Sequence, residues 1–311
     1  MTADRAPISA VVVDYCSGTL LRECAESLLR EGAANLVVVD NAPAGAAELS
    51  SEAVLRDLDA PPGWLDVVGT ARNVGYGAGA NLGVSRTTSE QVLVCNPDVV
   101  LQDGALDRLA SCLDADPARA IAGPRMLTPA GELYPSARRF PNLVDAAGHG
   151  FVGLVLPRNR WTRRYTMGEW DHAVRADVDW VSGACFLVRR SAWETLAGFD
   201  EDYFMYAEDV DLCWRARRLG WKVAYEPAAT VTHVQGCSTQ RHPWRMLVSH
   251  HRSLFRFAVR SSRGWERALL PVVAVGLVVR TAAASARRAC AGSAAPTRVS
   301  AEMSHPASET R

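Results

Sequence analysis

Three acidic side chains follow a run of aromatic and apolar residues in the stretch YFMYAEDVDLCWR, residues 203–215. A carboxylate held away from bulk water, such as Glu208 or Asp209, can act as a general base and take a proton from an attacking hydroxyl group. Acids in the first turn of a helix also stabilise the helix dipole, and Asp211 has the i, i+4 spacing to pair with Arg215. We therefore expect proton-transfer chemistry from Glu208 or Asp209 and a bracing role for Asp211, with dipole stabilisation as the alternative for the other two.

A second group of polar residues follows an apolar run in VLVCNPDV, residues 92–99. A strand that ends near Asp98 can present this carboxylate to a divalent cation that also binds phosphate oxygens, because hard cations prefer oxygen ligands. Asn-Pro-Asp is also a frequent turn sequence, which is the alternative for Asn96 and Asp98. His233 ends another apolar run, ATVTHV, where a histidine is either a metal ligand or a structural residue.

The elements that must position these residues alternate between apolar runs and helical patterns in the first third of the chain. Continuous apolar strands separated by helices predict an α/β fold with a mostly parallel central sheet covered on both faces. Ligands in such folds bind at the carboxyl ends of the strands. The predicted strands span 8–13, 35–40, 64–68 and 91–95, and the predicted helices span 19–30, 47–58, 78–85 and 104–113.

Polar residues stand at the carboxyl ends of three of these predicted strands. They are residues 14–15 (Asp-Tyr), 40–41 (Asp-Asn) and 96–98 (Asn-Pro-Asp). Each alone is explained by the turn preference of Asp and Asn, but the repetition at equivalent places predicts one binding rim.

The middle of the chain, residues 115–176, contains repeated prolines and arginines and is predicted to form connecting and lid-like structure. A single strand, WVSGACFLV, is expected over 180–188. Ser191 and Glu194 then have the spacing of a capping box. Two short strands, KVAYE and ATVTHV, are expected after residue 221.

Charge and cysteine content exclude several classes of protein. The 311 residues include 34 basic and 34 acidic side chains, so no overall positive field attracts a nucleic acid. The eight cysteines are scattered without a C-x-x-C pair, which indicates buried thiols in a reducing compartment. The N-terminus has no long apolar region followed by a small-residue cleavage site. We therefore expect a cytoplasmic protein that binds no nucleic acid.

The stretch VGYGAGA, residues 74–80, matches the dinucleotide fingerprint G-x-G-x-x-[GA] through Gly75, Gly77 and Ala80. That fingerprint belongs in the turn directly after the first strand, whereas here six residues separate it from the third predicted strand. A dehydrogenase is therefore a minor alternative.

The C-terminal segment differs in composition from the rest of the chain. Residues 250–288 carry many arginines around the apolar run ALLPVVAVGLVV, and its twelve residues are too few to cross a bilayer, which needs about 20. The mixture of arginine, aromatic and apolar residues predicts a helical segment that lies on a membrane surface. A core helix packed on the sheet is the alternative, and residues 289–311 are expected to be disordered.

An ordered set of motifs resembles glycosyltransferase family 2, whose members are inverting enzymes with the GT-A fold. The resemblance covers about residues 8–257, with residues 1–249 expected to form the GT-A domain. Within the family, YPSARRFP, PRNRWT and YFMYAEDVDLCWR look like the bacterial enzymes that transfer L-rhamnose from dTDP-L-rhamnose to N-acetylglucosaminyl-diphospho-decaprenol. The family motifs are VVVDY, VVVDN, ARNVGYGAGANLG, VLVCNPDV, WVSGACFLVRR, GFDEDYFMYAEDVDLCWRARRLGW and the histidine pair at 250–251.

The resemblance implies roles for individual residues. It gives Asp209 the role of catalytic base and places Glu208 beside the acceptor. Trp180 and Gly183 are further acceptor-side candidates, Trp180 as a platform for a sugar or as core packing, and Gly183 for close approach of a ligand. The residues implied to bind the donor are Tyr15, Asp40, Arg72, Asn73 and Asn96.

The resemblance also implies a divalent cation, Mg²⁺ or Mn²⁺, bound by Asp98 and His233. Asn96 departs from the family's D-x-D motif, in which the first residue is an acid. An amide supplies less charge than a carboxylate, so we expect metal to bind mainly together with the donor's diphosphate.

These expectations combine into one function. We expect an inverting rhamnosyltransferase that uses dTDP-L-rhamnose and a polyprenyl-diphosphate-linked N-acetylglucosamine, forms the linker of cell-wall arabinogalactan, and lies on the inner face of the cell membrane. The alternatives are a family 2 enzyme that transfers another sugar, a non-catalytic protein that binds a nucleotide sugar, and the dehydrogenase.

Overall fold

The protein is described by a computed structural model over residues 6–42, 50–70, 72–140, 170–234 and 243–291. β1 (Ile8–Asp14) pairs in parallel with β2 (Asn35–Asp40) on one side and with β4 (Gln91–Cys95) on the other. β3 (Leu65–Gly69) extends this parallel set beside β2. All four strands were predicted from their apolar runs, and their carboxyl ends meet at one edge as expected.

The other half of the sheet mixes strand directions. β11 (Cys185–Arg189) lies antiparallel between β4 and β6 (Arg119–Leu127), and β6 pairs in parallel with β12 (Lys222–His233). The described order is β3-β2-β1-β4-β11-β6-β12-β5, with β7 on β6 and β9 on β12. The short strands are β5 (Val99–Leu101), β7 (Leu133–Tyr134) and β9 (Ala176–Val178).

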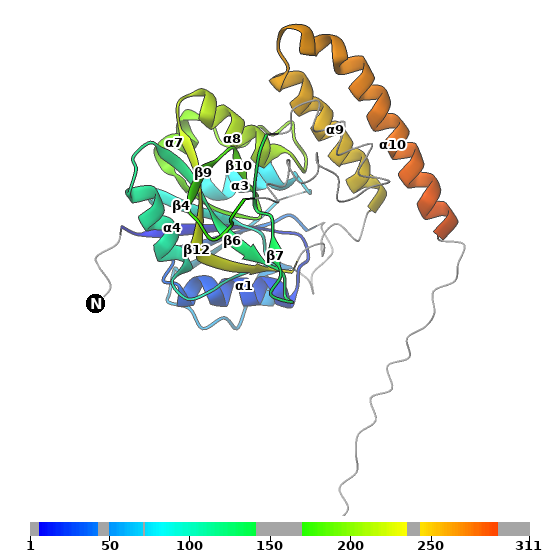
Figure 1. The fold of residues 1–311 in the computed structure, drawn as a ribbon. Helices are drawn as coiled ribbons and strands as arrows, with labels where there is room; N and C mark the ends of the chain where they lie inside the picture. The colour runs from blue at the N-terminus through cyan, green and yellow to red at the C-terminus, as the bar shows by residue number, and fades with distance from the viewer. Residues whose placement is uncertain (1–5, 43–49, 71, 141–169, 235–242, 292–311) are drawn as a thin grey trace, which may run out of the picture.

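Helices cover both faces of the sheet (Figure 1). Side chains alternate along β1, so Ala10 and Val12 pack with α1 and α4 on one face, whereas Val11 and Val13 pack with α3 and α8 on the other. The first layer contains α1 (Thr19–Arg30), α2 (Ser51–Leu55) and α4 (Ala105–Asp114). The second contains α3 (Tyr76–Ser85), α7 (Arg190–Thr195) and α8 (Glu208–Arg218).

The C-terminal segment forms a helical hairpin beside the second layer (Figure 1). It consists of α9 (Pro243–Ser261), the 3₁₀ turn η3 (Gly264–Leu269) and α10 (Leu270–Ala291), and α10 packs against α9. The expected domain boundary after residue 249 therefore falls inside α9. Residues 292–311, most of the expected disordered tail, lie outside the described residues.

Several details of the prediction are wrong. Residues 180–188 do not form one strand, because the backbone turns at 182–184 between β10 (Trp180–Val181) and β11. β10 pairs instead with β8 (Ala137–Arg138) in a separate two-stranded sheet. Ser191 lies inside α7 and does not cap it, since the helix already begins at Arg190.

The region around β6 and β12 was also mispredicted. β6 is a nine-residue, largely buried strand within the segment expected to be a lid, although residues 141–169 of that segment lie outside the described residues. Pro124 is tolerated in β6 because β12 shifts its register between Glu226 and Thr230, directly beside it. The same irregularity keeps KVAYE and ATVTHV in one continuous strand instead of two.

Candidate active site

Asp98 and His233 come together at the carboxyl edge of the sheet. β5 begins directly after Asp98 and pairs antiparallel with the end of β12, which brings His233 Nε2 to 3.2 Å from Asp98 Oδ1. Asn96 Nδ2 lies 3.5 Å from the same imidazole nitrogen. Both Asp98 and His233 are buried, and His233 Nδ1 has no hydrogen-bond partner among the described residues.

This pair fits a divalent cation that takes its remaining ligands from a bound molecule. A carboxylate oxygen and an imidazole nitrogen are both metal donors, and nitrogen suits Mn²⁺ better than Mg²⁺. Within the described residues, no group of three or more His, Cys, Asp or Glu side chains is arranged to hold a metal ion. That result is consistent with Asn96 standing where a further acid would complete such a group.

The polar rim, defined here as residues 14–15, 40–41 and 96–98, lies at the predicted edge. Asp14 is fully buried and accepts hydrogen bonds from Ser17 N and Ser51 Oγ at 3.1 and 3.0 Å. Burial raises the pKa of Asp14, although these hydrogen bonds oppose the rise. Asp40 is half-buried, and its two oxygens accept from Ala42 N at 2.8 Å and Ser51 N at 2.9 Å. Both acids therefore hold the start of α2 in place.

Asn41 anchors the loop that carries Arg72 and Asn73. Its Oδ1 accepts from Thr70 Oγ1 at 2.9 Å, and its Nδ2 donates to Gly75 O at 2.9 Å. Asn73 Oδ1 accepts from Gly75 N at 2.9 Å, which closes a tight turn before α3. Arg72 is exposed beside this turn, whereas Tyr15 is half-buried on the rim.

Asp209 lies at the start of α8 and faces the turn between β10 and β11. Its Oδ2 accepts from Gly183 N at 2.8 Å, and its Oδ1 accepts from Val210 N at 2.8 Å. Burial raises the pKa of Asp209, while the two backbone N–H groups and the positive charge of Arg138 lower it. The ionised form of Asp209 is thus stabilised by named partners.

Glu208, the neighbouring acid, is held very differently. Its side chain is buried, and its Oε2 has no hydrogen-bond partner among the described residues. Burial, followed by the negative charge of Asp209, raises the pKa of Glu208 to about 8. Asp209 is thus the acid whose charged form has hydrogen-bond donors, whereas burial and the negative charge of Asp209 favour the neutral form of Glu208.

The polar rim and Asp209 are connected through the sheet. Asn96 N donates to Ala184 O at 2.8 Å, and the adjacent Gly183 donates its N–H to Asp209. A Cβ at Gly183 would lie 3.0 Å from the Asp209 Cβ, so the close neighbour of this glycine in the structure is the Asp209 side chain. This contact is an alternative to the predicted close approach of a ligand at Gly183.

The strained loop, defined here as residues 203–207, leads into α8. Tyr206 and Ala207 have φ values of 71° and 62°, a left-handed conformation that costs on the order of 1–3 kcal/mol at each non-glycine residue. Tyr76 N donates to Phe204 O at 3.1 Å from the other side. Gly75, at φ 90°, leaves room for this contact, since a Cβ there would lie 2.3 Å from Phe204 O. These contacts therefore hold a strained backbone directly before Glu208 and Asp209.

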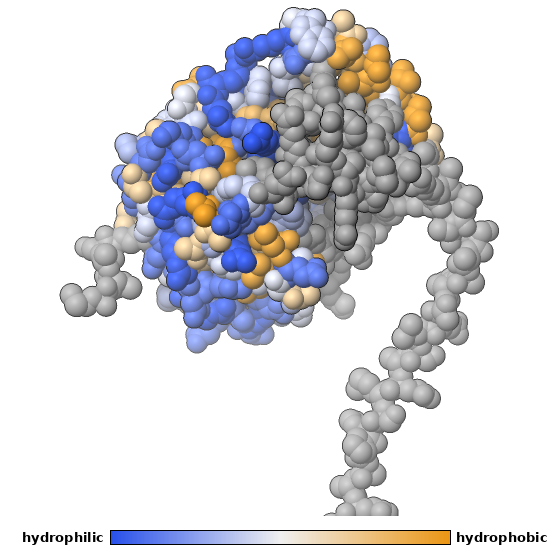
Figure 2. All heavy atoms as spheres, in the orientation of Figure 1, coloured by the Kyte–Doolittle hydropathy of each residue, from blue (hydrophilic) through white to orange (hydrophobic). Residues whose placement is uncertain are grey.

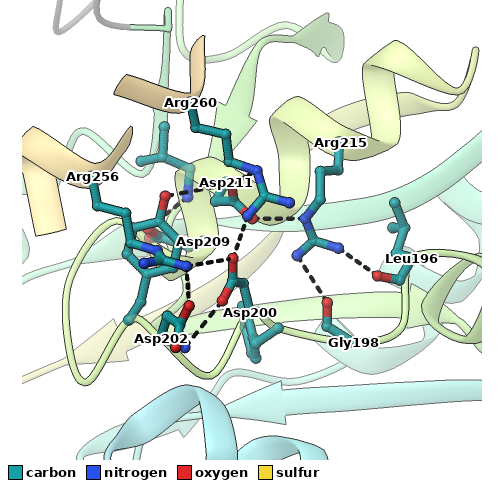
Figure 3. A network of polar contacts seen from close by, with 12 residues as sticks. Leu196, Gly198, Asp200, Asp202, Asp209, Asp211, Arg215, Arg256 and Arg260 are labelled. Atoms are coloured by element: carbon teal, nitrogen blue, oxygen red, sulfur yellow. Dashed lines mark hydrogen bonds and ion pairs between the residues drawn. The ribbon is translucent and has the colours of Figure 1, made fainter. Parts of the chain in front are cut away.

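Asp211 braces α8, as predicted. Its Oδ2 accepts from Arg215 Nε at 2.7 Å, and the Arg215 guanidinium also donates to the carbonyls of Leu196 and Gly198 (Figure 3). Asp211 is fully buried and pairs additionally with Arg260 from α9. The prediction for Asp211 is confirmed, and its second partner was not foreseen.

Trp180 is packed beneath this region. Its side chain is 5% exposed, and its Nε1 donates to Arg139 O at 2.9 Å. The guanidinium of Arg138 lies 5.3 Å from its ring centre. These contacts favour the packing alternative over a platform for a sugar.

Three residues near the site received no individual role from the sequence. The positive charge of Arg138 lowers the pKa of Asp209. Tyr76 donates a hydrogen bond from its hydroxyl to Gly183 O at 2.6 Å, and Asn41 holds the loop that carries Arg72. The motif YPSARRFP contains Arg138, and Asn41 is one of the polar residues that follow the second predicted strand, so the sequence contained a signal for both. Tyr76 gave no signal, because its contact depends on the turn at 182–184.

The sequence of this chain is similar to those of known glycosyltransferases. A sequence profile described as "Glycosyltransferase like family 2" matches residues 6–255. The N-acetylglucosaminyl-diphospho-decaprenol L-rhamnosyltransferase of Mycobacterium tuberculosis is 39% identical over 212 residues, covering 65% of this chain and 69% of the relative. Rhamnosyltransferase WbbL of Escherichia coli K12 is 33% identical over 136 residues, or 42% of this chain and 48% of that protein.

Two solved structures share the fold. The mannosyltransferase PcManGT from Pyrobaculum calidifontis, solved with GDP-Man and Mn²⁺, matches with a TM-score of 0.57 and 18% identity, covering 93% of this chain and 80% of that chain. GalNAc-T7, solved with UDP, GalNAc and Mn²⁺, matches with a TM-score of 0.56 and 14% identity, covering 74% and 43%. At these identities the likeness extends to the α/β glycosyltransferase fold.

Proposed function

Because this chain belongs to the glycosyltransferase like family 2, we propose that it transfers L-rhamnose, with inversion, from dTDP-L-rhamnose to a polyprenyl-diphosphate-linked N-acetylglucosamine. The named activity of the Mycobacterium tuberculosis relative supports both the sugar and the acceptor class. The product would be the rhamnosyl-N-acetylglucosamine linker of a cell-wall polysaccharide. A family 2 enzyme that transfers a different sugar is the alternative that the experiment below must exclude.

The contrast between the two acids is the observation that carries the proposal: Asp209 accepts two backbone N–H groups, whereas Glu208 Oε2 has no hydrogen-bond partner among the described residues and burial raises the pKa of Glu208 to about 8. Inverting transfer needs one carboxylate to take the proton from the acceptor hydroxyl while the oxygen of that hydroxyl attacks the anomeric carbon. The bond between that carbon and the diphosphate breaks as the new bond forms, and the diphosphate leaves with the bonding electrons. Glu208, kept neutral, can donate a hydrogen bond to the bound acceptor without competing for the proton.

The polar rim is the proposed donor site. Tyr15 supplies a ring that can stack on the nucleotide base, and Asp40 retains lone pairs that can accept from a base N–H. Arg72, exposed beside the turn at Asn73, can pair with the diphosphate. Asn96 replaces an acid and can hydrogen-bond the ribose or a water.

Asp98 and His233 are the proposed ligands of Mg²⁺ or Mn²⁺, with the imidazole favouring Mn²⁺. The metal, when bound, would offset the negative charge that develops on the departing diphosphate. The separation of 3.2 Å between His233 Nε2 and Asp98 Oδ1 supports this assignment, because both donors already point to one place. With Asn96 neutral, the diphosphate must supply the rest of the charge that binds the metal.

The helical hairpin is proposed to rest on the inner surface of the cell membrane. Hydrophobic residues gather on the outer side of α10 (Figure 2), where Val272, Val275 and Val278 are 65%, 64% and 68% exposed. Arg263 and Arg267 are exposed near the start of α10 and can meet anionic headgroups. The exposed valines contradict the alternative of a core helix. Of the helices that the structure describes, none is long and apolar enough to cross a membrane.

A transfer assay tests the function directly. Purified protein is incubated with a panel of nucleotide sugars and polyprenyl-diphosphate acceptors, with and without EDTA, and the products are identified by mass spectrometry. The proposal predicts rhamnosyl transfer that EDTA abolishes and Mn²⁺ restores. Transfer of another sugar would retain the family but overturn the donor, and absence of transfer in every combination would overturn the function.

A further inference from the structure

Helix α9 makes an ion-pair cluster with the segment that precedes and begins α8. Arg256 and Arg260 stand one helical turn apart on α9 and reach three carboxylates (Figure 3). Arg260 Nε lies 3.2 Å from Asp211 Oδ1, and the same guanidinium pairs with Asp200. Arg256 pairs with Asp202 and lies 3.5 Å from Asp200 Oδ2. The cluster therefore connects α9 to residues before the strained loop, Asp200 and Asp202, and to Asp211 after it.

Helix α9 also touches the strained loop itself. Ser253 Oγ donates to Met205 O at 2.9 Å, and Ser253 is buried. The His250 ring packs edge-on against Tyr206 at 5.0 Å between centres. Because Tyr76 N holds Phe204 O from the opposite side, the loop is clamped between α3 and α9.

The clamp acts on residues that would otherwise relax. Tyr206 and Ala207 are left-handed without being glycine, and such conformations persist only where the surroundings enforce them. Glu208 and Asp209 follow directly, so their position depends on the conformation of Tyr206 and Ala207. Asp211, one turn into α8, retains Arg215 as a partner even without α9, so the helix itself does not require Arg260.

We infer that Arg256, Arg260 and Ser253 of α9 are positioning residues for the carboxylate pair, so that the C-terminal hairpin completes the active site as well as meeting the membrane. They act through the strained loop and touch no reacting atom. The inference rests on the proposed function for the role of Asp209, but the position of the loop does not. It follows that seating of α9 and turnover are coupled.

The first experiment measures the loop independently of activity. Hydrogen exchange of backbone amides in peptides covering 200–211 is followed in the full-length wild type, in Arg260→Ala and in Ser253→Ala. Arg86→Ala is the matched control. Arg86 forms an exposed ion pair with Asp66, with 2.6 Å between Nε and Oδ2, and neither residue belongs to α9. We expect exchange in 203–209 to rise about tenfold in the two α9 variants and to stay unchanged in the control, since the opened loop loses its enforced conformation.

The second experiment measures rhamnosyl transfer with a short-chain, detergent-soluble acceptor, so that membrane binding does not enter. We expect kcat to fall about tenfold or more in Arg260→Ala while KM for the donor stays within about twofold, because misplacement of the base affects the chemical step. Arg260→Lys should recover part of kcat, since it restores the charge beside Asp200. Ser253→Ala removes one hydroxyl and serves if Arg260→Ala does not fold.

The outcomes separate the two claims. Wild-type exchange and wild-type kcat in both α9 variants would overturn the inference, as would faster exchange with unchanged kcat. Faster exchange in 203–209 in the two α9 variants, together with a wild-type protein that transfers no rhamnose, would support the role of α9 in holding the loop and overturn the proposed function instead.

Discussion

Asp40 and Glu208 are two acids of the proposed active site, and their surroundings differ in hydrogen bonding and in backbone conformation. Asp40 ends a regular parallel strand, and each of its carboxylate oxygens accepts a backbone N–H. Glu208 follows two left-handed residues, and one of its oxygens has no partner among the described residues. Asp40 is thus a satisfied acid at the end of a regular strand, whereas the carboxylate pair combines strain with a desolvated acid.

This difference separates binding from chemistry. A donor site gains from preformed groups whose hydrogen bonds are already satisfied and that need no rearrangement. A general base must instead have a pKa suited to the proton that it accepts. The structure supplies the second property by burying Glu208 and by giving Asp209 two backbone N–H groups. Both sides meet at 182–184, where Gly183 binds Asp209 and Ala184 binds Asn96.

The largest expected effect comes from Asp209→Asn. Removal of the general base should lower kcat by roughly 1,000-fold, within the range known for such groups, while binding of the nucleotide donor is unchanged. Glu208→Gln is the matched control, because it keeps a neutral, hydrogen-bonding side chain and should retain transfer within about tenfold. Steady-state kinetics together with calorimetric donor titration check both. Similar losses in the two variants would erase the distinction between the acids.

A smaller loss of activity is expected from His233→Ala, beside Asp98 of the polar rim. Without the imidazole, transfer should fall roughly 100-fold, because one of two proposed protein ligands of the metal is lost. A high Mn²⁺ concentration should restore part of the rate, which distinguishes a ligand from a structural residue. Turnover measured against Mn²⁺ concentration gives the answer, and an unchanged metal dependence would return His233 to a structural role.

A second connection between the two sides, from Asn41 through Gly75 to Phe204, is tested by Gly75→Ala, with Gly131→Ala as control. Both glycines have positive φ, but only at Gly75 would a Cβ meet another residue, at 2.3 Å from Phe204 O. We expect Gly131→Ala to cost about 1 kcal/mol of unfolding free energy from backbone strain alone. Gly75→Ala should cost about 2 kcal/mol or more and lower transfer roughly tenfold through the displaced loop. Equal effects in denaturant unfolding would mean that the contact with Phe204 is unimportant.

The smallest effect concerns stability against pH. The pKa of Glu208 is raised to about 8 in the folded protein, so the folded state holds a proton that the unfolded chain releases at lower pH. The unfolding free energy must therefore fall as the pH rises from the unfolded pKa toward about 8, and then level off. Glu208→Gln should raise Tm by a few degrees at pH 8 and by little at pH 4, as judged by calorimetry. A Tm difference independent of pH would contradict the buried, protonated Glu208.

The rim could be predicted from sequence because it depends on local pattern. Apolar runs such as ISAVVVD and NLVVVD fix strands, and residues directly after them must share one edge of a parallel sheet. Asp98 followed from the same logic. His233 required the family resemblance, since β12 begins eleven residues earlier and reaches β5 only after a register shift.

The surroundings of the carboxylate pair could not be predicted in the same way. The arginines that pair with Asp200 and Asp211 come from a helix about 50 residues further along the chain, and no local spacing relates them. The left-handed Tyr206 and Ala207 contradict the usual preferences of those residue types, so they arise from tertiary contacts. The turn that separates β10 from β11 was missed for the same reason, because Asp209 and Tyr76 hold it from elsewhere.

The proton on Glu208 is the most direct test of this account. Infrared difference spectroscopy at about pH 7 can detect a buried protonated carboxyl group by its C=O band and compare wild type with Glu208→Gln and Asp209→Asn. We predict that the band disappears in Glu208→Gln and persists in Asp209→Asn, because burial, the largest cause of the raised pKa of Glu208, is retained when the charge of Asp209 is removed. Loss of the band in Asp209→Asn with retention in Glu208→Gln would show that Asp209 holds the proton, and Asp209 would then not be the base.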